Sequence, residues 1–112
     1  MGIRLDKPWR LLSPSQVARV HGHLGVYQLG DDAGSVLYVG VAGGRSLFGL
    51  GGELQRELAS PRAGVTRFRV EVSAQYRTRW QELLMLHRAD HGELPRHNQG
   101  ERLPKLGRLS PA

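Results

Sequence analysis

The pattern of apolar and polar side chains predicts three β-strands in this chain. Two of them, residues 24–29 and 35–39, flank Gly30–Gly34, a dense cluster of turn-forming residues. The pair is therefore expected to form an antiparallel hairpin. The third strand, residues 66–72, carries its apolar side chains on one face and its charged side chains on the other. That pattern is typical of a strand with one buried and one solvated face.

The first helix is predicted after an irregular N-terminal segment, residues 1–12. Ser13 can cap the helix, Pro14 fits its first position and Gln16 completes a capping box. The helix is short and ends before Gly22. Three apolar side chains of the N-terminal segment are candidate anchors to the core: Trp9, Leu11 and Leu12.

Two further helices follow the hairpin. A glycine-rich stretch, residues 40–52, is expected to be a flexible loop leading into a helix that is most regular over residues 53–59 and stops at Ser60-Pro61. The last helix covers residues 75–91, with Gly92 as its stop. Its core-facing stripe has helical spacing and consists of Tyr76, Trp80, Leu83, Leu84 and His87.

This order of elements predicts an α/β (α+β) fold, a small three-stranded antiparallel sheet flanked by helices. The 112 residues suffice for one domain. We expect an N-terminal extension with a short helix over residues 1–21, the main domain over 22–99 and a loosely held C-terminal tail over 100–112.

Composition excludes several classes of protein. The chain has no cysteine, which rules out disulfides, thiolate metal sites and a cysteine nucleophile. No apolar run approaches the roughly 20 residues of a membrane span, so we expect a cytoplasmic protein without membrane contacts. Sixteen basic residues, fourteen of them arginine, face ten acidic ones for a net charge of +6. Such a balance favours phosphate-rich partners, although solvated surface arginines would produce it equally well.

Two tripeptides on the predicted hairpin stand out. Gly25-Val26-Tyr27 lies on the first strand and Tyr38-Val39-Gly40 on the second, and a glycine in such a position permits close backbone approach. Glu82 follows in the last helix, and Pro95 and Asn98 come after it. In this order and spacing the chain resembles the GIY-YIG nuclease family over most of its length.

The resemblance implies an endonuclease that hydrolyses phosphodiester bonds in DNA with one Mg²⁺ or Mn²⁺ ion. Glu82 would hold the metal, Tyr27 or Tyr38 would orient or deprotonate the attacking water, and Asn98 would complete the site. A metal ion and a guanidinium together offset the charge that builds on phosphate oxygens. Because the ordinary pKa of tyrosine is near 10, a tyrosine acting as a base needs a nearby cation.

The arginine that the family carries early in the helix after the second tripeptide is absent here. That window, residues 48–52, holds Phe48, Leu50 and three glycines. Arg56, slightly later in the helix, and Arg45, in the glycine-rich stretch, are the two candidates, and it is also open that neither serves.

Each candidate also has a structural interpretation. Tyr27 and Tyr38 are ordinary strand residues, Glu82 can pair with Arg79, and Asn98 is a common turn residue. Two other classes of protein therefore stay open: a nucleic-acid-binding module that keeps the fold but not turnover, and a small basic domain within a larger assembly. Specificity would then come from the terminal extensions, a partner protein or a dimer.

Overall fold

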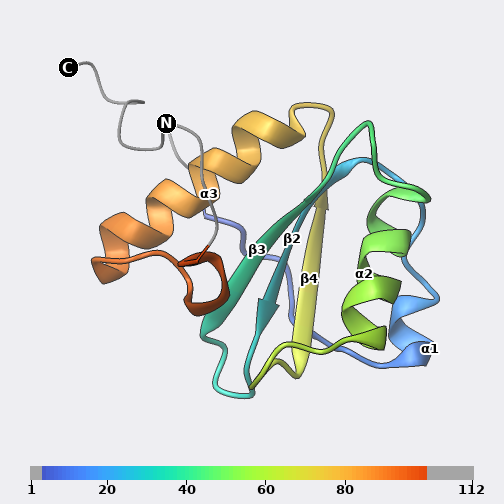
Figure 1. The fold of residues 1–112 in the computed structure, drawn as a ribbon, viewed down its shortest axis with the longest axis horizontal. Helices are drawn as coiled ribbons and strands as arrows, with labels where there is room; N and C mark the ends of the chain where they lie inside the picture. The colour runs from blue at the N-terminus through green and yellow to red at the C-terminus, as the bar shows by residue number, and fades with distance from the viewer. Residues whose placement is uncertain (1–3, 101–112) are drawn as a thin grey trace.

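The sheet of this α+β fold has four antiparallel strands. The computed structural model describes residues 4–100, and its strands lie in the order β1-β4-β2-β3 (Figure 1). They span Arg10–Leu11 (β1), Gly25–Gly30 (β2), Val36–Ala42 (β3) and Arg67–Val72 (β4). The long central strand β2 pairs with β3 on one side and with β4 on the other.

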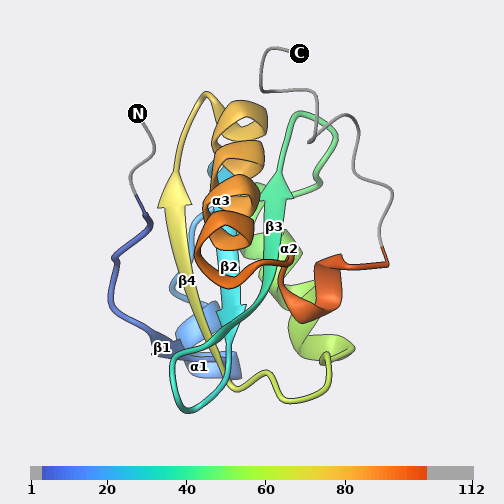
Figure 2. The same ribbon diagram turned by 90° about the vertical axis from the view of Figure 1, so that its left-hand side faces the viewer.

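Helices cover both faces of the sheet. Helices α1 (Pro14–Val17) and α2 (Gly49–Ala59) lie on one face, and α3 (Tyr76–His91) lies on the other (Figures 1 and 2). A short 3₁₀ turn, η1 (Arg96–Asn98), follows α3 and contacts β3. Within residues 4–100 no helix combines the length and the apolar character that crossing a membrane requires.

The alternation of the strands divides the core into two layers. Tyr27 and Leu29 of β2 point toward α2, whereas Val26 points toward α3. The layer under α1 and α2 is built on Val17, Tyr27, Leu29, Ala42, Leu50, Leu54 and Phe68. The layer under α3 is built on Leu5, Val26, Val39, Leu83 and Leu84.

The predicted hairpin is confirmed. Strands β2 and β3 pair antiparallel, with Tyr27 opposite Gly40. The turn between them is held by Asp31, whose carboxylate accepts hydrogen bonds from the backbone N–H groups of Ala33 and Ser35 at 3.0 and 2.9 Å. This is the local bonding that makes aspartate a turn residue.

The prediction of three strands was wrong, because β1 was missed. Arg10 and Leu11 pair with β4 opposite Phe68 and Arg67. A two-residue strand carries too little alternation to be found by pattern. Of the proposed anchors Leu12 packs on the core, but Leu11 is 54% exposed. Within the described part of the N-terminal segment, residues 4–12, Leu5 is deeply buried instead, at 3% exposure.

Helix α1 begins as the sequence predicts. Ser13 is the N-cap, its side chain accepts from the backbone N–H of Gln16, and Pro14 occupies the first turn. The second half of the capping box is absent: the Gln16 side chain accepts from Arg10 Nε at 3.2 Å instead of turning back to Ser13.

Helix α2 starts at Gly49, inside the stretch predicted to be a loop. A Cβ at Gly51 would lie 2.6 Å from the carbonyl oxygen of Val20, and one at Gly52 would lie 2.2 Å from that of Leu47. These glycines therefore serve close packing of the helix against its neighbours rather than chain flexibility.

Helix α3 matches the predicted range and ends at Gly92, whose φ of 81° forms a left-handed C-cap. Leu83 and Leu84 of its stripe are buried. The charged face of β4 is less solvated than predicted, because Arg69 donates to Gln28 and Glu71 pairs with Arg79 of α3. Beyond Gly100, the tail predicted over residues 100–112 lies outside the described residues.

Candidate functional site

Tyr27 and Tyr38 form part of a closed polar cluster under α2. Their ring centroids lie 6.0 Å apart. The Tyr27 hydroxyl donates to Glu57 Oε2 at 2.9 Å. Arg62 donates to both oxygens of the same carboxylate, at 2.9 and 3.2 Å, and its guanidinium lies 3.6 Å from the centre of the Tyr38 ring. The two motif tyrosines are thus joined through one buried glutamate and one arginine.

This environment keeps the Tyr27 phenol protonated. Burial, and then the neighbouring Glu57 carboxylate, raise the pKa of Tyr27 well above its ordinary value. Burial is the largest single effect on the pKa of the Arg62 guanidinium and lowers it, but the hydrogen bond to Glu57 and the attraction of the Glu57 carboxylate and the two tyrosines together raise it. Tyr27 is only 2% exposed, and the nearby cation Arg62 is already paired. The phenol therefore acts here as a hydrogen-bond donor to Glu57.

Gly40 fits the close approach that its motif position predicted. A Cβ built there would lie 2.2 Å from Cζ of Tyr27. The Tyr27 ring therefore occupies the space that any larger residue at position 40 would fill, and packing alone requires this pairing of tyrosine and glycine.

Glu82 lies on α3, across the sheet from Tyr27 and Tyr38. It pairs with Arg79 one turn back, and Arg79 also binds Glu71 of β4 at 2.7 and 3.0 Å. The hydrogen bond to Glu71 is the main reason that the pKa of Arg79 is raised. This is the pairing with Arg79 that the sequence left open as the structural alternative.

The described residues do not fit a divalent cation at Glu82. Hard cations take several oxygen ligands, whereas residues 4–100 contain no group of three histidine, aspartate or glutamate side chains that could hold a metal. Glu82 already neutralises part of the charge of Arg79. A carboxylate that is committed to a guanidinium is a poor single anchor for Mg²⁺ or Mn²⁺.

Asn98 is fully buried against β3. Its side-chain oxygen accepts from the backbone N–H of Val39 at 2.8 Å, and its side-chain N–H₂ donates to the Val39 carbonyl at 3.1 Å. The Trp80 indole N–H donates to that same carbonyl at 3.0 Å. Asn98 therefore binds η1 to β3, the last strand of the sheet, with the pair of backbone hydrogen bonds that a neighbouring strand would make.

The two candidate arginines lie in different surroundings. Arg56 is 78% exposed and pairs with Glu53 on its own helix at 2.9 Å. Arg45 lies in the loop after β3 and lines a groove. The six residues singled out from the sequence are thus distributed over five places, and among them only Tyr27 and Tyr38 are neighbours.

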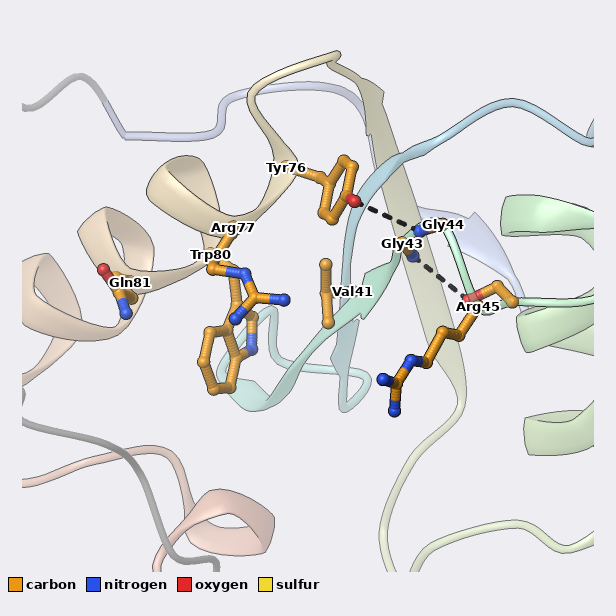
Figure 3. Close-up of a pocket in the computed structure, with 9 residues that line it drawn as sticks. Val41, Gly43, Gly44, Arg45, Tyr76, Arg77, Trp80 and Gln81 are labelled. Carbon is orange, nitrogen blue, oxygen red and sulfur yellow. Dashed lines mark hydrogen bonds between the residues drawn. The ribbon is translucent and has the colours of Figure 1, made fainter.

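The groove that Arg45 lines lies between the loop after β3 and the first turns of α3. Its volume is about 710 Å³, within the range of about 300–1,000 Å³ common for small-molecule sites. Figure 3 shows its lining, which consists of Val41, Gly43, Gly44, Arg45, Ser46, Tyr76, Arg77, Trp80 and Gln81.

Hydrogen bonds fix the wall of the groove. The backbone N–H of Gly44 donates to the Tyr76 hydroxyl at 3.2 Å, and that of Gly43 donates to the Ser46 hydroxyl at 3.1 Å (Figure 3). A Cβ at Gly43 would lie 2.8 Å from the Tyr76 ring, so the loop and the ring are in direct contact. The groove is therefore formed before any ligand arrives.

The charge of the groove is positive. Arg45 and Arg77 are both exposed and extend from opposite walls (Figure 3). Among the described residues, 4–100, no carboxylate lines the groove and neither arginine makes an ion pair. Two unpaired guanidinium groups over a partly apolar surface suit an anion, and phosphate above all.

Comparison with known proteins gives one family. A family model described as a domain of unknown function (DUF7508) matches residues 3–90. The chain belongs to this family. No curated protein matches it in a sequence search. In this DUF7508 domain the matched segment includes every residue of the groove and ends before Asn98.

Four important residues of this DUF7508 domain were missed from the sequence: Glu57, Arg62, Tyr76 as a wall of the groove, and Arg77. The sequence contains a sign that Glu57 is buried, because it continues the stripe of Leu50 and Leu54 at helical spacing. It also contains a sign that Arg77 makes no ion pair along its helix, since no acidic residue stands three or four positions from it. No sequence pattern indicates the contact between the loop and Tyr76 of α3, because it depends on the tertiary packing of two segments far apart in the chain.

Proposed function

We propose that this DUF7508 domain binds nucleic acid through the groove of Arg45 and Arg77 and does not cleave it. The observation that carries the proposal is a preformed groove in which, among residues 4–100, two guanidinium groups make no ion pair and no carboxylate takes part in the lining. Arginine's planar fork matches phosphate geometry, and the net charge of +6 adds long-range attraction for a polyanion.

The geometry of the predicted catalytic residues favours binding over turnover. Tyr27 is buried and donates to Glu57, so it neither reaches water nor acts as a base. Glu82 is on the other face of the sheet and pairs with Arg79. Hydrolysis of a phosphodiester would need a metal ion and a base close to the same phosphate. Glu82 and Tyr27 lie on opposite faces of the sheet and do not meet that condition.

The second candidate is the GIY-YIG-type DNA endonuclease that the motif order implies, with Glu82 holding Mg²⁺ or Mn²⁺. One observation favours it: Tyr27 and Tyr38 come together on adjacent antiparallel strands, with ring centroids 6.0 Å apart. The GIY-YIG-like fold therefore remains part of the proposal, whichever function it serves.

A combined binding and cleavage assay separates the two. Labelled single-stranded, duplex and branched DNA, and RNA, are incubated with the protein in Mg²⁺, in Mn²⁺ and in EDTA. Each sample is then run on a native and on a denaturing gel. We expect a mobility shift at low salt with intact strands in every condition.

Glu82→Gln provides the decisive variant, because it keeps the shape of the side chain and removes the charge that a metal needs. Metal-dependent cleavage by the wild type that Glu82→Gln abolishes would establish the nuclease and overturn the binding-only proposal. Absence of any shift at low salt would remove both candidates.

A further inference from the structure

The groove has features that phosphate binding alone does not require. Trp80 lines its floor together with Val41, and Tyr76 forms part of its wall. A site built only for the backbone of a duplex needs cations on an open surface, as the phosphate contacts of DNA-binding proteins show. Aromatic rings beside the cations point to a ligand that also has an apolar face.

Both rings are held in place. The Trp80 indole N–H donates to the Val39 carbonyl at 3.0 Å, and the Tyr76 hydroxyl accepts from Gly44 at 3.2 Å. Each polar edge is therefore anchored to the protein backbone, while both side chains still line the groove (Figure 3). Rings fixed in this way lose little freedom when a ligand stacks on them.

We infer that the groove takes an unpaired nucleotide of a single-stranded nucleic acid. The base stacks on the Trp80 side of the floor, and the flanking phosphates bind Arg45 and Arg77 on the two walls. Stacking on aromatic side chains between cations is the usual way in which proteins bind single strands. A base inside a duplex keeps its faces covered by its neighbours and cannot use such a floor. This inference rests on the proposed function, because it specifies the ligand of the same groove.

Tryptophan fluorescence gives a direct test, since the chain has two tryptophans. Trp9 is held on the sheet by Arg69, whose guanidinium lies 4.1 Å from its ring centre, and it does not line the groove. Trp9→Phe therefore leaves Trp80 as the reporter of the groove. In the matched control, Trp80→Phe leaves Trp9 as the reporter of a site outside it.

Three ligands are titrated into each variant: a short oligothymidylate, the same strand in a duplex, and an abasic strand of equal length and charge. We expect the oligothymidylate to quench the emission of Trp9→Phe but not that of Trp80→Phe. Its affinity should exceed that of the abasic strand by roughly 5- to 150-fold, the range of one stacked base. A ribonucleotide strand, titrated as a fourth ligand, determines whether the sugar contributes to the affinity.

The outcomes distinguish this inference from the proposed function. Equal, salt-dependent binding of all strands without quenching of Trp80 would overturn the unpaired-nucleotide site and leave nucleic-acid binding intact. Binding of none of the strands at low salt would overturn both. Circular dichroism spectra that match the wild type establish that each variant is folded before it is titrated.

Discussion

Replacing Glu57 tests whether the motif tyrosines belong to the framework of the fold. In Glu57→Ala the buried Tyr27 hydroxyl loses its acceptor at 2.9 Å, and Arg62 loses its carboxylate. A hydrogen bond to a charged group contributes about 1.5–3 kcal/mol. The one methylene group removed from the core adds about 0.8 kcal/mol, and the partly exposed Arg62 pair adds less than about 1 kcal/mol. We expect Glu57→Ala to lower the free energy of unfolding by about 2–4 kcal/mol.

Tyr27→Phe removes the donor of the same hydrogen bond while Glu57 keeps Arg62, so its cost should be only about 1–1.5 kcal/mol. Both changes remove the same hydrogen bond between Tyr27 and Glu57. The double variant should therefore lose less unfolding free energy than the two single variants lose together, by about 1 kcal/mol. Arg56→Ala on the same helix is the control. Its side chain is 78% exposed and its ion pair with Glu53 is local to the helix, so the change should stay within about 0.5 kcal/mol.

The assay is urea unfolding followed by far-ultraviolet circular dichroism, with the dependence of the unfolding free energy on urea compared between variants. A cost for Glu57→Ala no larger than that of Arg56→Ala, or strict additivity with Tyr27→Phe, would refute the structural role of the cluster. The folded Tyr27→Phe protein should also bind nucleic acid as the wild type does, because Tyr27 does not line the groove.

Three further predictions concern stability. Asn98→Ala leaves the buried Val39 N–H without its acceptor, so urea unfolding should show a loss of about 2–3 kcal/mol, and the amide hydrogen of Val39 should exchange faster. Gly40→Ala places a methyl group against the Tyr27 ring and should cost about 1–3 kcal/mol by the same measurement, whereas Gly100→Ala, with nothing within 4 Å, should cost almost nothing. Because the folded state raises the pKa of Tyr27, the unfolded chain loses its phenol proton near pH 10 while the native protein keeps it. Urea midpoints should therefore fall as the pH rises above about 10, and Tyr27→Phe should make that fall shallower.

The parts of the fold that pattern predicted are those in which each residue's environment depends on near neighbours. The hairpin follows from two strand signals around a cluster of turn residues, β4 from local alternation and α3 from helical spacing. Strand β1 is only two residues long and exists because β4 offers it an edge, which no local pattern records. The start of α2 at Gly49 likewise depends on distant backbone, since Gly51 faces the carbonyl of Val20.

The candidate site was less predictable, because the role of a side chain depends on its partners. The motif brought Tyr27 and Tyr38 together, but Glu57, thirty residues after Tyr27, decides that Tyr27 donates a hydrogen bond. Glu82 was correctly placed on the last helix, and its partner Arg79 determines its charge environment. The groove requires that Arg45 and Arg77, from segments far apart in the chain, face each other across one surface.

Salt dependence of binding tests the central claim, that Arg45 and Arg77 contact the phosphates of a nucleic acid. The double variant Arg45→Ala/Arg77→Ala is compared with Arg19→Ala/Arg88→Ala, which has the same net charge and loses two exposed arginines outside the groove. On single-stranded DNA each lost phosphate contact reduces the slope of log affinity against log salt by about 0.7. We expect a slope shallower by about 1.4 for the groove variant and an unchanged slope for the control. Equal slopes for the two variants would contradict this claim.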